Sequence, residues 1–273
     1  MNKGNVWLVG AGPGEAGLIT VKGLHCIQSA DVIVHDRLVN TELIAQAPEH
    51  CEIINVGKEQ DYHPIPQEKI NQILVKHAQS GKQVVRLKGG DPYVFGRGGE
   101  EAEVLAQHGI QFEIVPGISS SIGGLAYAGI PVTHRDYASG FHVITGHTSQ
   151  GNERQNWKAL AQLEGTLIIL MGMTRLVEIC QQLILHGKSS ATPAAVIMYA
   201  SHPKQERVIG TLKTLAAKVE EKNLHAPALI VVGDVVNLSA TLSFTSTSFT
   251  ISELSSKLKN FTGKTFTDEQ FHE

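Results

Sequence analysis

The 273-residue sequence predicts an α/β fold built as two α/β domains. Short apolar runs alternate with amphipathic stretches along most of the chain, which is typical of βαβ units and a largely parallel sheet. The length exceeds that of most single domains, and the pair Pro116-Gly117 separates two series of such units. Hydrophobic residues make up 42% of the chain and charged residues 18%, which indicates an ordinary globular protein with a sizeable core.

The first domain is predicted over residues 1–117 and holds five strands with helices between them. Pro66 near the start of one helical stretch and Gly81 at its end are typical boundary residues, because proline suits the first helical turn and glycine the residue after the last. The strands are expected at 6–10, 32–35, 52–56, 83–87 and 111–115, and the helices at 16–29, 41–46, 66–81 and 98–109.

The second domain is predicted over residues 118–239 and begins with a helix rich in small residues at 119–129. From about Ser239 the chain is rich in Ser and Thr and shows little periodicity, so residues 240–273 are expected to form a poorly ordered tail. The strands of this domain are expected at 141–145, 166–171, 193–198, 207–210 and 227–233, with helices between them.

Charge and cysteine content exclude several classes of protein. The formal net charge of -3 provides no general attraction to nucleic acid or membranes, so we expect neither as a partner. Cys26, Cys51 and Cys180 are isolated, with no CxxC pair and no histidine at ligand spacing, so we expect no disulfide framework, no metal site and a reducing cytoplasm. No leader-like segment and no run of 18 apolar residues is present, so we expect neither export nor a membrane span.

Unusual residues follow four consecutive strands of the first predicted sheet. The strand ends lead into Gly10-Ala11-Gly12-Pro13-Gly14, His35-Asp36-Arg37, Gly57-Lys58 and Lys88-Gly89-Gly90-Asp91-Pro92. Parallel α/β sheets bind ligands beyond the carboxyl ends of their strands, where the chain leaves the sheet. The sequence therefore predicts one ligand site at this edge of the sheet.

The first glycine loop resembles the dinucleotide-binding pattern GxGxxG but departs from it. Glu15 stands where the third glycine would allow close helix packing, and Pro13 removes an N–H that could bind a pyrophosphate. A nicotinamide or flavin site is thus disfavoured. A plain tight turn between strand and helix remains an alternative to a ligand-binding loop.

Asp36 and Lys58 have structural explanations when each is taken alone, as a turn former and as a solvated side chain. At adjacent strand ends they could instead form an acid/base pair, since a lysine near a carboxylate can exchange protons near neutral pH. Further basic side chains at the same edge form either a surface ion-pair network or a patch for carboxylate groups: Arg37, Arg86, Lys88, Arg97, His134 and Arg135.

A series of motifs in order resembles the tetrapyrrole methylase family over about residues 5–238. RLKGGDPYVFGRGGEE, residues 86–101, followed by AYAGIPVTHR, residues 126–135, is the most specific part of this resemblance. The other matching stretches are VWLVGAGPG, HDRLV, the Gly57-Lys58 pair, VPGISS, the TGH at 145–147, the LMG at 170–172 and APALIVVGDVV.

The resemblance implies two α/β domains with S-adenosylmethionine bound in the cleft between them. It implies C-methylation of uroporphyrinogen III at carbons 2 and 7, giving precorrin-2 by way of precorrin-1 and S-adenosylhomocysteine, by a homodimer serving sirohaem or cobalamin biosynthesis. It places the proton acceptor at Asp36 and the proton donor at Lys58. The methyl-donor contacts it implies are Pro13, Gly89, Gly90, Asp91, Val94, Ser119, Ser120, Met171 and Ala200.

Two departures from the family pattern stand near the predicted site. Glu15-Ala16-Gly17 replaces a stretch that usually contains Asp-Pro, and His35 replaces a tyrosine before Asp36. Two other functions stay open at this point. One is another methylase of the superfamily, acting on precorrin-4, a diphthamide precursor or ribosomal RNA, and the other is a module that senses S-adenosylmethionine without catalysis.

Overall fold

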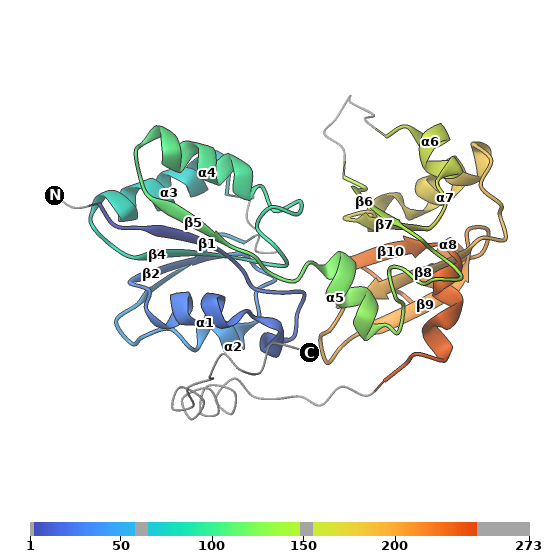
Figure 1. The fold of residues 1–273 in the computed structure, drawn as a ribbon, viewed down its shortest axis with the longest axis horizontal. Coiled ribbons are helices and arrows are strands. Elements are labelled where there is room, and N and C mark those ends of the chain that lie inside the picture. The colour runs from blue at the N-terminus through green and yellow to red at the C-terminus, as the bar shows by residue number, and fades with distance from the viewer. Residues whose placement is uncertain (1–2, 58–64, 148–154, 245–273) are drawn as a thin grey trace, which may run out of the picture.

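The computed structural model describes residues 3–57, 65–147 and 155–244, which form two five-stranded sheets flanked by helices (Figure 1). The two sheets lie in two separate lobes, and the segment from β5 to α5 connects them. The α/β fold class predicted from the sequence is therefore confirmed. The boundaries at 117 and 239 stay a prediction.

The first sheet is entirely parallel, as the sequence predicts, with the strand order β3-β2-β4-β1-β5. The central strands β1 and β4 are neighbours, and the chain leaves them in opposite directions across the sheet, toward β2 and toward β5. Such a switch point opens a crevice at the carboxyl ends of the strands. The strands are β1 (Val6–Gly10), β2 (Val32–His35), β3 (Glu52–Asn55), β4 (Val84–Lys88) and β5 (Phe112–Val115).

Helices cover both faces of the first sheet, with α3 and α4 on one face and α1 and α2 on the other (Figure 1). Side chains of β1 alternate between the two cores: Val6 and Leu8 pack on the α3 side, and Val9 packs with Leu24 of α1. The elements are the 3-10 helix η1 (Ala16–Leu18), α1 (Val21–Gln28), α2 (Thr41–Ile44), α3 (Gln67–Gln79) and α4 (Gly98–Gln107).

The second sheet is mixed, which corrects the prediction of a largely parallel arrangement. Only β6 and β7 pair in parallel, whereas β10 runs antiparallel to both of its neighbours, β7 and β8, and β8 runs antiparallel to β9. A continuous apolar run suits a buried strand of either direction, so its direction could not be read from the sequence. The order is β6 (Phe141–Thr145), β7 (Thr166–Leu170), β10 (Ala228–Val232), β8 (Pro193–Met198), β9 (Glu206–Thr211).

A loop of residues 199–205 joins β8 to β9 without the helix that the sequence predicts there. Alternate residues of β10 enter two cores: Leu229 and Val231 share a core with Leu125 of α5, and Ile230 and Val232 pack on the opposite face. The remaining elements are α5 (Ser120–Tyr127), α6 (Trp157–Gln162), η2 (Met173–Arg175), α7 (Leu176–Leu185), α8 (Leu215–Glu221) and η3 (Asp234–Ala240).

The first residues of the predicted tail contact the second sheet and its helix α5. Ser243 Oγ accepts a hydrogen bond from Arg207 at 2.8 Å, and the ring of Phe244 meets Tyr127 edge-on at 5.6 Å. The rest of that tail, residues 245–273, lies outside the described residues. Within the described ranges, no helix is both long and apolar enough to cross a membrane.

Candidate active site

The two glycine loops that follow β1 and β4 are bonded to each other at the carboxyl edge of the first sheet. Gly90 N–H donates to Gly12 O at 2.7 Å, and Gly12 N–H donates to Gly90 O at 3.2 Å. Ala11 N–H donates to Lys88 O at 2.7 Å. The predicted convergence of strand ends at one edge is thus confirmed for these two loops, which form one backbone surface.

Gly89 and Gly90 expose that backbone to open space. A Cβ at Gly89 would have only Leu38 Cβ within 4 Å, at 3.7 Å, and a Cβ at Gly90 would lie 3.8 Å from Ser119 Cα. Gly90 also has a φ of +68°, which L side chains rarely adopt. These two residues, called the glycine surface below, therefore leave room for a ligand against the main chain.

Gly10 and Gly117 serve close packing of loops instead. A Cβ at Gly10 would lie 2.5 Å from Gly117 Cα and 2.6 Å from Gly90 O. Gly96 and Gly98 likewise have no space, since a Cβ on either would lie within 2.7 Å of Pro92 O. The second glycine loop therefore combines an open surface at Gly89 and Gly90 with a tight turn at Gly96 and Gly98.

Gly117→Ala is expected to destabilise the protein by roughly 1–3 kcal/mol, the usual range for overpacking. The added Cβ would lie 2.3 Å from Gly90 O and 2.6 Å from Gly10 Cα, and backbone atoms on both sides cannot rotate away. Denaturant unfolding followed by circular dichroism measures the change. Gly99→Ala is the control, because its Cβ meets nothing within 4 Å; equal midpoints for the two variants would contradict the prediction.

Asp91 shapes the loop with both of its carboxylate oxygens. Oδ1 accepts from Tyr93 N–H at 2.8 Å, and Oδ2 accepts from Gly117 N–H at 3.0 Å. The carboxylate therefore ties the loop after β4 to the loop after β5. Its predicted contact with the methyl donor stays a prediction.

The second lobe brings its own predicted residues toward the first glycine loop. Ser119 caps α5, accepting from Ser121 N–H at 3.3 Å, and Ser120 is the first residue of that helix. A Cβ at Gly14 would lie 2.8 Å from Ala200 O, and a Cβ at Gly123 would lie 3.1 Å from Pro13 Cγ. Pro13, Ala200 and the start of α5 therefore belong to one region, although they come from both halves of the chain.

Backbone strain occurs in several of the loops that carry predicted site residues. Six non-glycine residues in the described ranges have positive φ angles, and five of them lie in the segments 95–97, 171 and 199–201. Met171 follows β7 with a φ of 55° and a half-exposed side chain, and Val94 is also exposed. Strained conformations of non-glycine residues tend to occur at functional sites, which supports these loops as a binding region.

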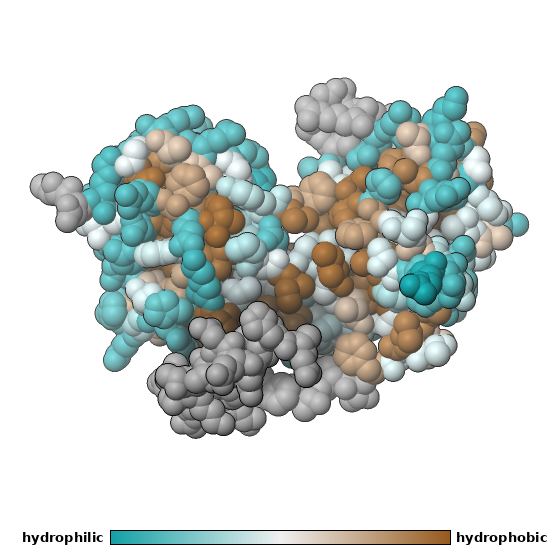
Figure 2. Space-filling model, in the orientation of Figure 1, coloured by the Kyte–Doolittle hydropathy of each residue, from teal (hydrophilic) through white to brown (hydrophobic). Residues whose placement is uncertain are grey.

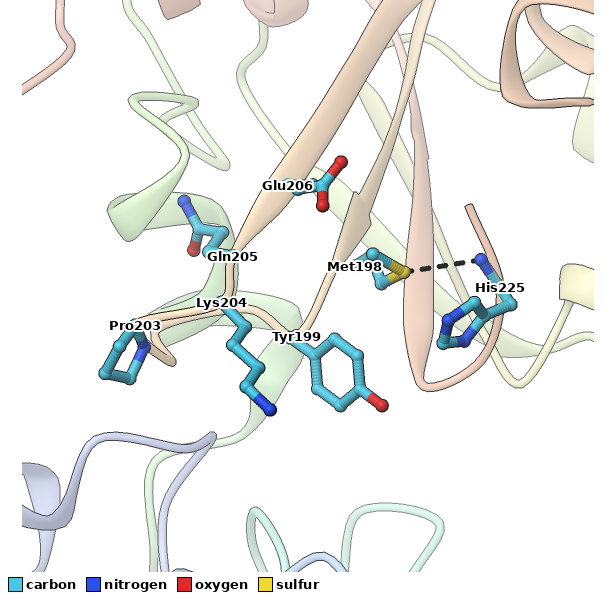
Figure 3. Close-up of a pocket in the computed structure, with 7 residues that line it drawn as sticks. All are labelled: Met198, Tyr199, Pro203, Lys204, Gln205, Glu206 and His225. Carbon is cyan, nitrogen blue, oxygen red and sulfur yellow. Dashed lines mark hydrogen bonds between the residues drawn. The ribbon is translucent and has the colours of Figure 1, made fainter. Parts of the chain in front are cut away.

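Figure 2 shows the surface hollowed between the two lobes, with apolar side chains exposed along the hollow. An open depression of about 500 Å³ lies at the end of β8 (Figure 3), where Tyr199 and Lys204 point away from the strands. None of the predicted site residues lines it, although Ala200 follows Tyr199 in the chain. Its lining residues are Met198, Tyr199, Pro203, Lys204, Gln205, Glu206 and His225.

Asp36 follows β2 at the same sheet edge and is held by a buried arginine. Arg86 Nη2 donates to Asp36 Oδ1 at 2.5 Å, and the Arg86 side chain is 2% exposed whereas that of Asp36 is 35% exposed. The carboxylate is thus fixed from below and accessible from solvent. Lys58, the other predicted catalytic residue, lies outside the described residues.

Arg86 and Lys88 fit neither predicted alternative, a surface ion-pair network or a patch for carboxylate groups, because both side chains are buried beneath the edge. Each donates to Glu101 Oε1 at 3.0 Å. Burial by itself would lower the pKa of Arg86, but Asp36 and Glu101 raise it above its ordinary value. Burial and the neighbouring Arg86 lower the pKa of Lys88.

Only some of the predicted basic residues lie at the surface, where they could bind carboxylate groups. Arg37 and Arg135 are exposed, and Arg97 is exposed but bonded to Glu100 at 2.7 and 2.9 Å. Sequence reasoning missed Glu101. The available signal was its spacing of three residues from Gly98 and four from the buried Leu105, which puts a carboxylate on the buried face of α4.

Residues 5–216 match the family model of Tetrapyrrole (Corrin/Porphyrin) Methylases. The chain belongs to the tetrapyrrole methylase family. A uroporphyrinogen-III C-methyltransferase from Priestia megaterium is 54% identical over 237 residues, which are 86% of this chain and 100% of that protein. A siroheme synthase from Acinetobacter baylyi is 48% identical over 236 residues, 86% of this chain, and the chain spans 52% of its length.

A solved structure agrees with this tetrapyrrole methylase fold. The crystal structure of a uroporphyrin-III C-methyl transferase from Thermus thermophilus complexed with S-adenyl homocysteine superposes with a TM-score of 0.74 at 41% identity. The match covers 86% of this chain and 100% of that one.

The two departures from the family pattern have defined places in this tetrapyrrole methylase. Glu15 N–H donates to Ser201 Oγ at 3.2 Å, so Glu15 joins the two lobes. Burial, together with the Glu15 carboxylate, raises the pKa of Tyr127 on α5 to about 12. His35 is buried with Nδ1 3.0 Å from Asp36 O, so its ring contacts the backbone of Asp36.

Proposed function

We propose that this chain transfers two methyl groups from S-adenosylmethionine to carbons 2 and 7 of uroporphyrinogen III, giving precorrin-2 by way of precorrin-1. The observation that carries this proposal is the Asp36 carboxylate, held by Arg86 and partly open to solvent at the sheet edge that also carries the glycine surface. Relatives named for this reaction or for siroheme synthesis support it.

The methyl donor fits the space at the glycine surface. Gly89 and Gly90 present backbone with open space in front of it, the only side-chain atom of the described residues near a Cβ at Gly89 being Leu38 Cβ at 3.7 Å. The exposed side chains of Val94 and Met171 offer apolar contacts for an extended ligand. S-adenosylmethionine supplies a methyl group on a sulfonium, which is already a strong electrophile. We assign its contacts to Pro13, Gly89, Gly90, Asp91, Val94, Ser119, Ser120, Met171 and Ala200.

The protein's own part in the reaction is alignment and proton management. A pyrrole carbon of the substrate is itself nucleophilic, so the residues need to orient it in line with the methyl group and exclude water. We assign proton acceptance to Asp36 and proton donation to Lys58. Among the described residues no group of three or more His, Cys, Asp or Glu side chains could hold a metal ion, and the assigned steps use none.

We further propose that the protein acts as a cytoplasmic homodimer in sirohaem or cobalamin biosynthesis, without nucleic-acid or membrane partners. Its cysteines are free thiols, and Cys26 and Cys180 are buried, which suits a reducing compartment. Light scattering of the purified protein tests the homodimer.

Incubation of the protein with uroporphyrinogen III and S-adenosylmethionine is expected to add two methyl groups to the macrocycle, read by mass spectrometry. Methylation of precorrin-4, or of a protein or RNA, in place of uroporphyrinogen III would assign the chain another reaction of the superfamily. Binding of S-adenosylmethionine in calorimetry without turnover of any of these substrates would indicate a sensor.

A further inference from the structure

Four charged side chains form one connected group beneath the predicted site. Glu101 Oε1 accepts from Arg86 Nε at 3.0 Å and from Lys88 Nζ at 3.0 Å, and Arg86 Nη2 continues to Asp36 Oδ1 at 2.5 Å. Glu101 has no exposed surface, and Arg86 and Lys88 are each 2% exposed. With all four ionised, two positive and two negative charges balance.

The guanidinium of Arg86 is fixed on every side. Besides the two carboxylates, Nη1 donates to Val34 O and Leu87 O, both at 3.3 Å. A planar fork with four partners has one orientation, so the position of Asp36 Oδ1 is set by atoms behind the sheet edge. Among the described residues, the charged partner of Arg86 on that inner side is Glu101.

The two carboxylate oxygens of Glu101 differ in their hydrogen bonding, and this difference is not explained by a gain in the stability of the fold. Gln67 Nε2 adds a third donor to Oε1 at 3.1 Å, whereas the buried Oε2 has no partner in the part of the chain that the structure describes. An unpaired buried oxygen is unfavourable, and a buried ion pair is often no more stabilising than apolar residues of the same size. The arrangement therefore calls for a functional explanation.

We propose that Glu101 is a positioning residue that acts through Arg86 on the Asp36 carboxylate, holding Arg86 on one Asp36 oxygen so that the other faces the substrate. This rests on the proposed role of Asp36 in proton transfer. When a neutral amide replaces Glu101, Asp36 is the remaining carboxylate near two buried cations. Arg86 is then drawn toward both Asp36 oxygens, and the carboxylate becomes a weaker, misaligned base.

A double-mutant cycle between Glu101→Gln and Asp36→Asn tests the proposal. We expect Glu101→Gln to lower kcat at least about tenfold, while the Kd for S-adenosylmethionine in calorimetry stays within about twofold, because general-base alignment affects turnover and not donor binding. In the Asp36→Asn background, Glu101→Gln is expected to change kcat less than about twofold, the non-additivity of residues that act as one unit. Glu103→Gln, an exposed position on the same helix, is the matched control.

The outcomes separate this proposal from the one it rests on. Equal losses of kcat from Glu101→Gln in both backgrounds, or no loss in a folded variant, would overturn the role of Glu101 and leave Asp36 untouched. Full kcat in Asp36→Asn would remove the base itself and with it the role of Glu101. If Glu101→Gln fails to fold, the cycle is run with Lys88→Met/Glu101→Gln, which leaves Arg86 and Asp36 as a balanced pair and is expected to show the same non-additivity.

Discussion

Asp36→Asn is expected to reduce turnover by about 100-fold or more, within the range that a positioned general base contributes. The amide has the shape of the carboxylate, and its oxygen can still accept from Arg86 Nη2, which in the parent protein lies 2.5 Å from Asp36 Oδ1. The amide cannot take a proton. The side chain is 35% exposed at the sheet edge, so the substitution is not expected to unfold the protein. Steady-state methylation of uroporphyrinogen III, followed by mass spectrometry, measures the effect.

The affinity of Asp36→Asn for S-adenosylmethionine shows whether the substitution affects only catalysis or also the structure of the binding site. Calorimetry with S-adenosylmethionine is expected to give the same Kd as the parent protein, since Asp36 is not among the proposed donor contacts. Asp234→Asn, at an exposed position in the second lobe, is the matched control for loss of a carboxylate and should keep full turnover. A lost donor affinity in Asp36→Asn would move this residue into a binding role.

Gly89→Ala is expected to weaken S-adenosylmethionine binding by about tenfold or more, a loss of roughly 1.4 kcal/mol for each factor of ten. The new Cβ would project over the glycine surface, where the protein places only Leu38 Cβ, at 3.7 Å. Because no protein atom is displaced and the φ of Gly89 lies outside the left-handed region, the fold should keep its stability. Calorimetry measures the affinity, and denaturant unfolding measures the stability.

Gly89 is a sharper test of the glycine surface than its neighbour. At Gly90 the φ of +68° would strain any side chain, so alanine there would disturb the backbone whether or not a ligand binds. Gly99→Ala, in the same glycine-rich stretch, is the control and should bind the donor normally, because a Cβ at Gly99 would meet no atom of the described residues within 4 Å. Unchanged affinity in Gly89→Ala would show that the glycine serves the turn alone.

The site was partly predictable because parallel strands place their carboxyl ends at one edge. Alternating apolar runs located β1, β2 and β4, and the residues after them had to meet once the sheet was parallel. Asp36 and the glycine surface could therefore be selected before any contact was known. The second sheet was predicted less well, since apolar runs such as 193–198 carry no sign of strand direction.

Sequence by itself determined the α/β class, the parallel first sheet and the residues that converge on its edge, because periodicity and glycine placement act locally along the chain. Only the tertiary structure determined which charged side chains are buried and which of them pair with one another. Arg86 and Lys88 lie in a strand among apolar residues, and their burial against Glu101 depends on how α4 packs on β4, a contact between segments 13 to 15 residues apart. The contact of Pro13 with Gly123 across the two lobes also depends on tertiary packing. A short stretch of sequence carries no signal for a contact between residues so far apart in the chain.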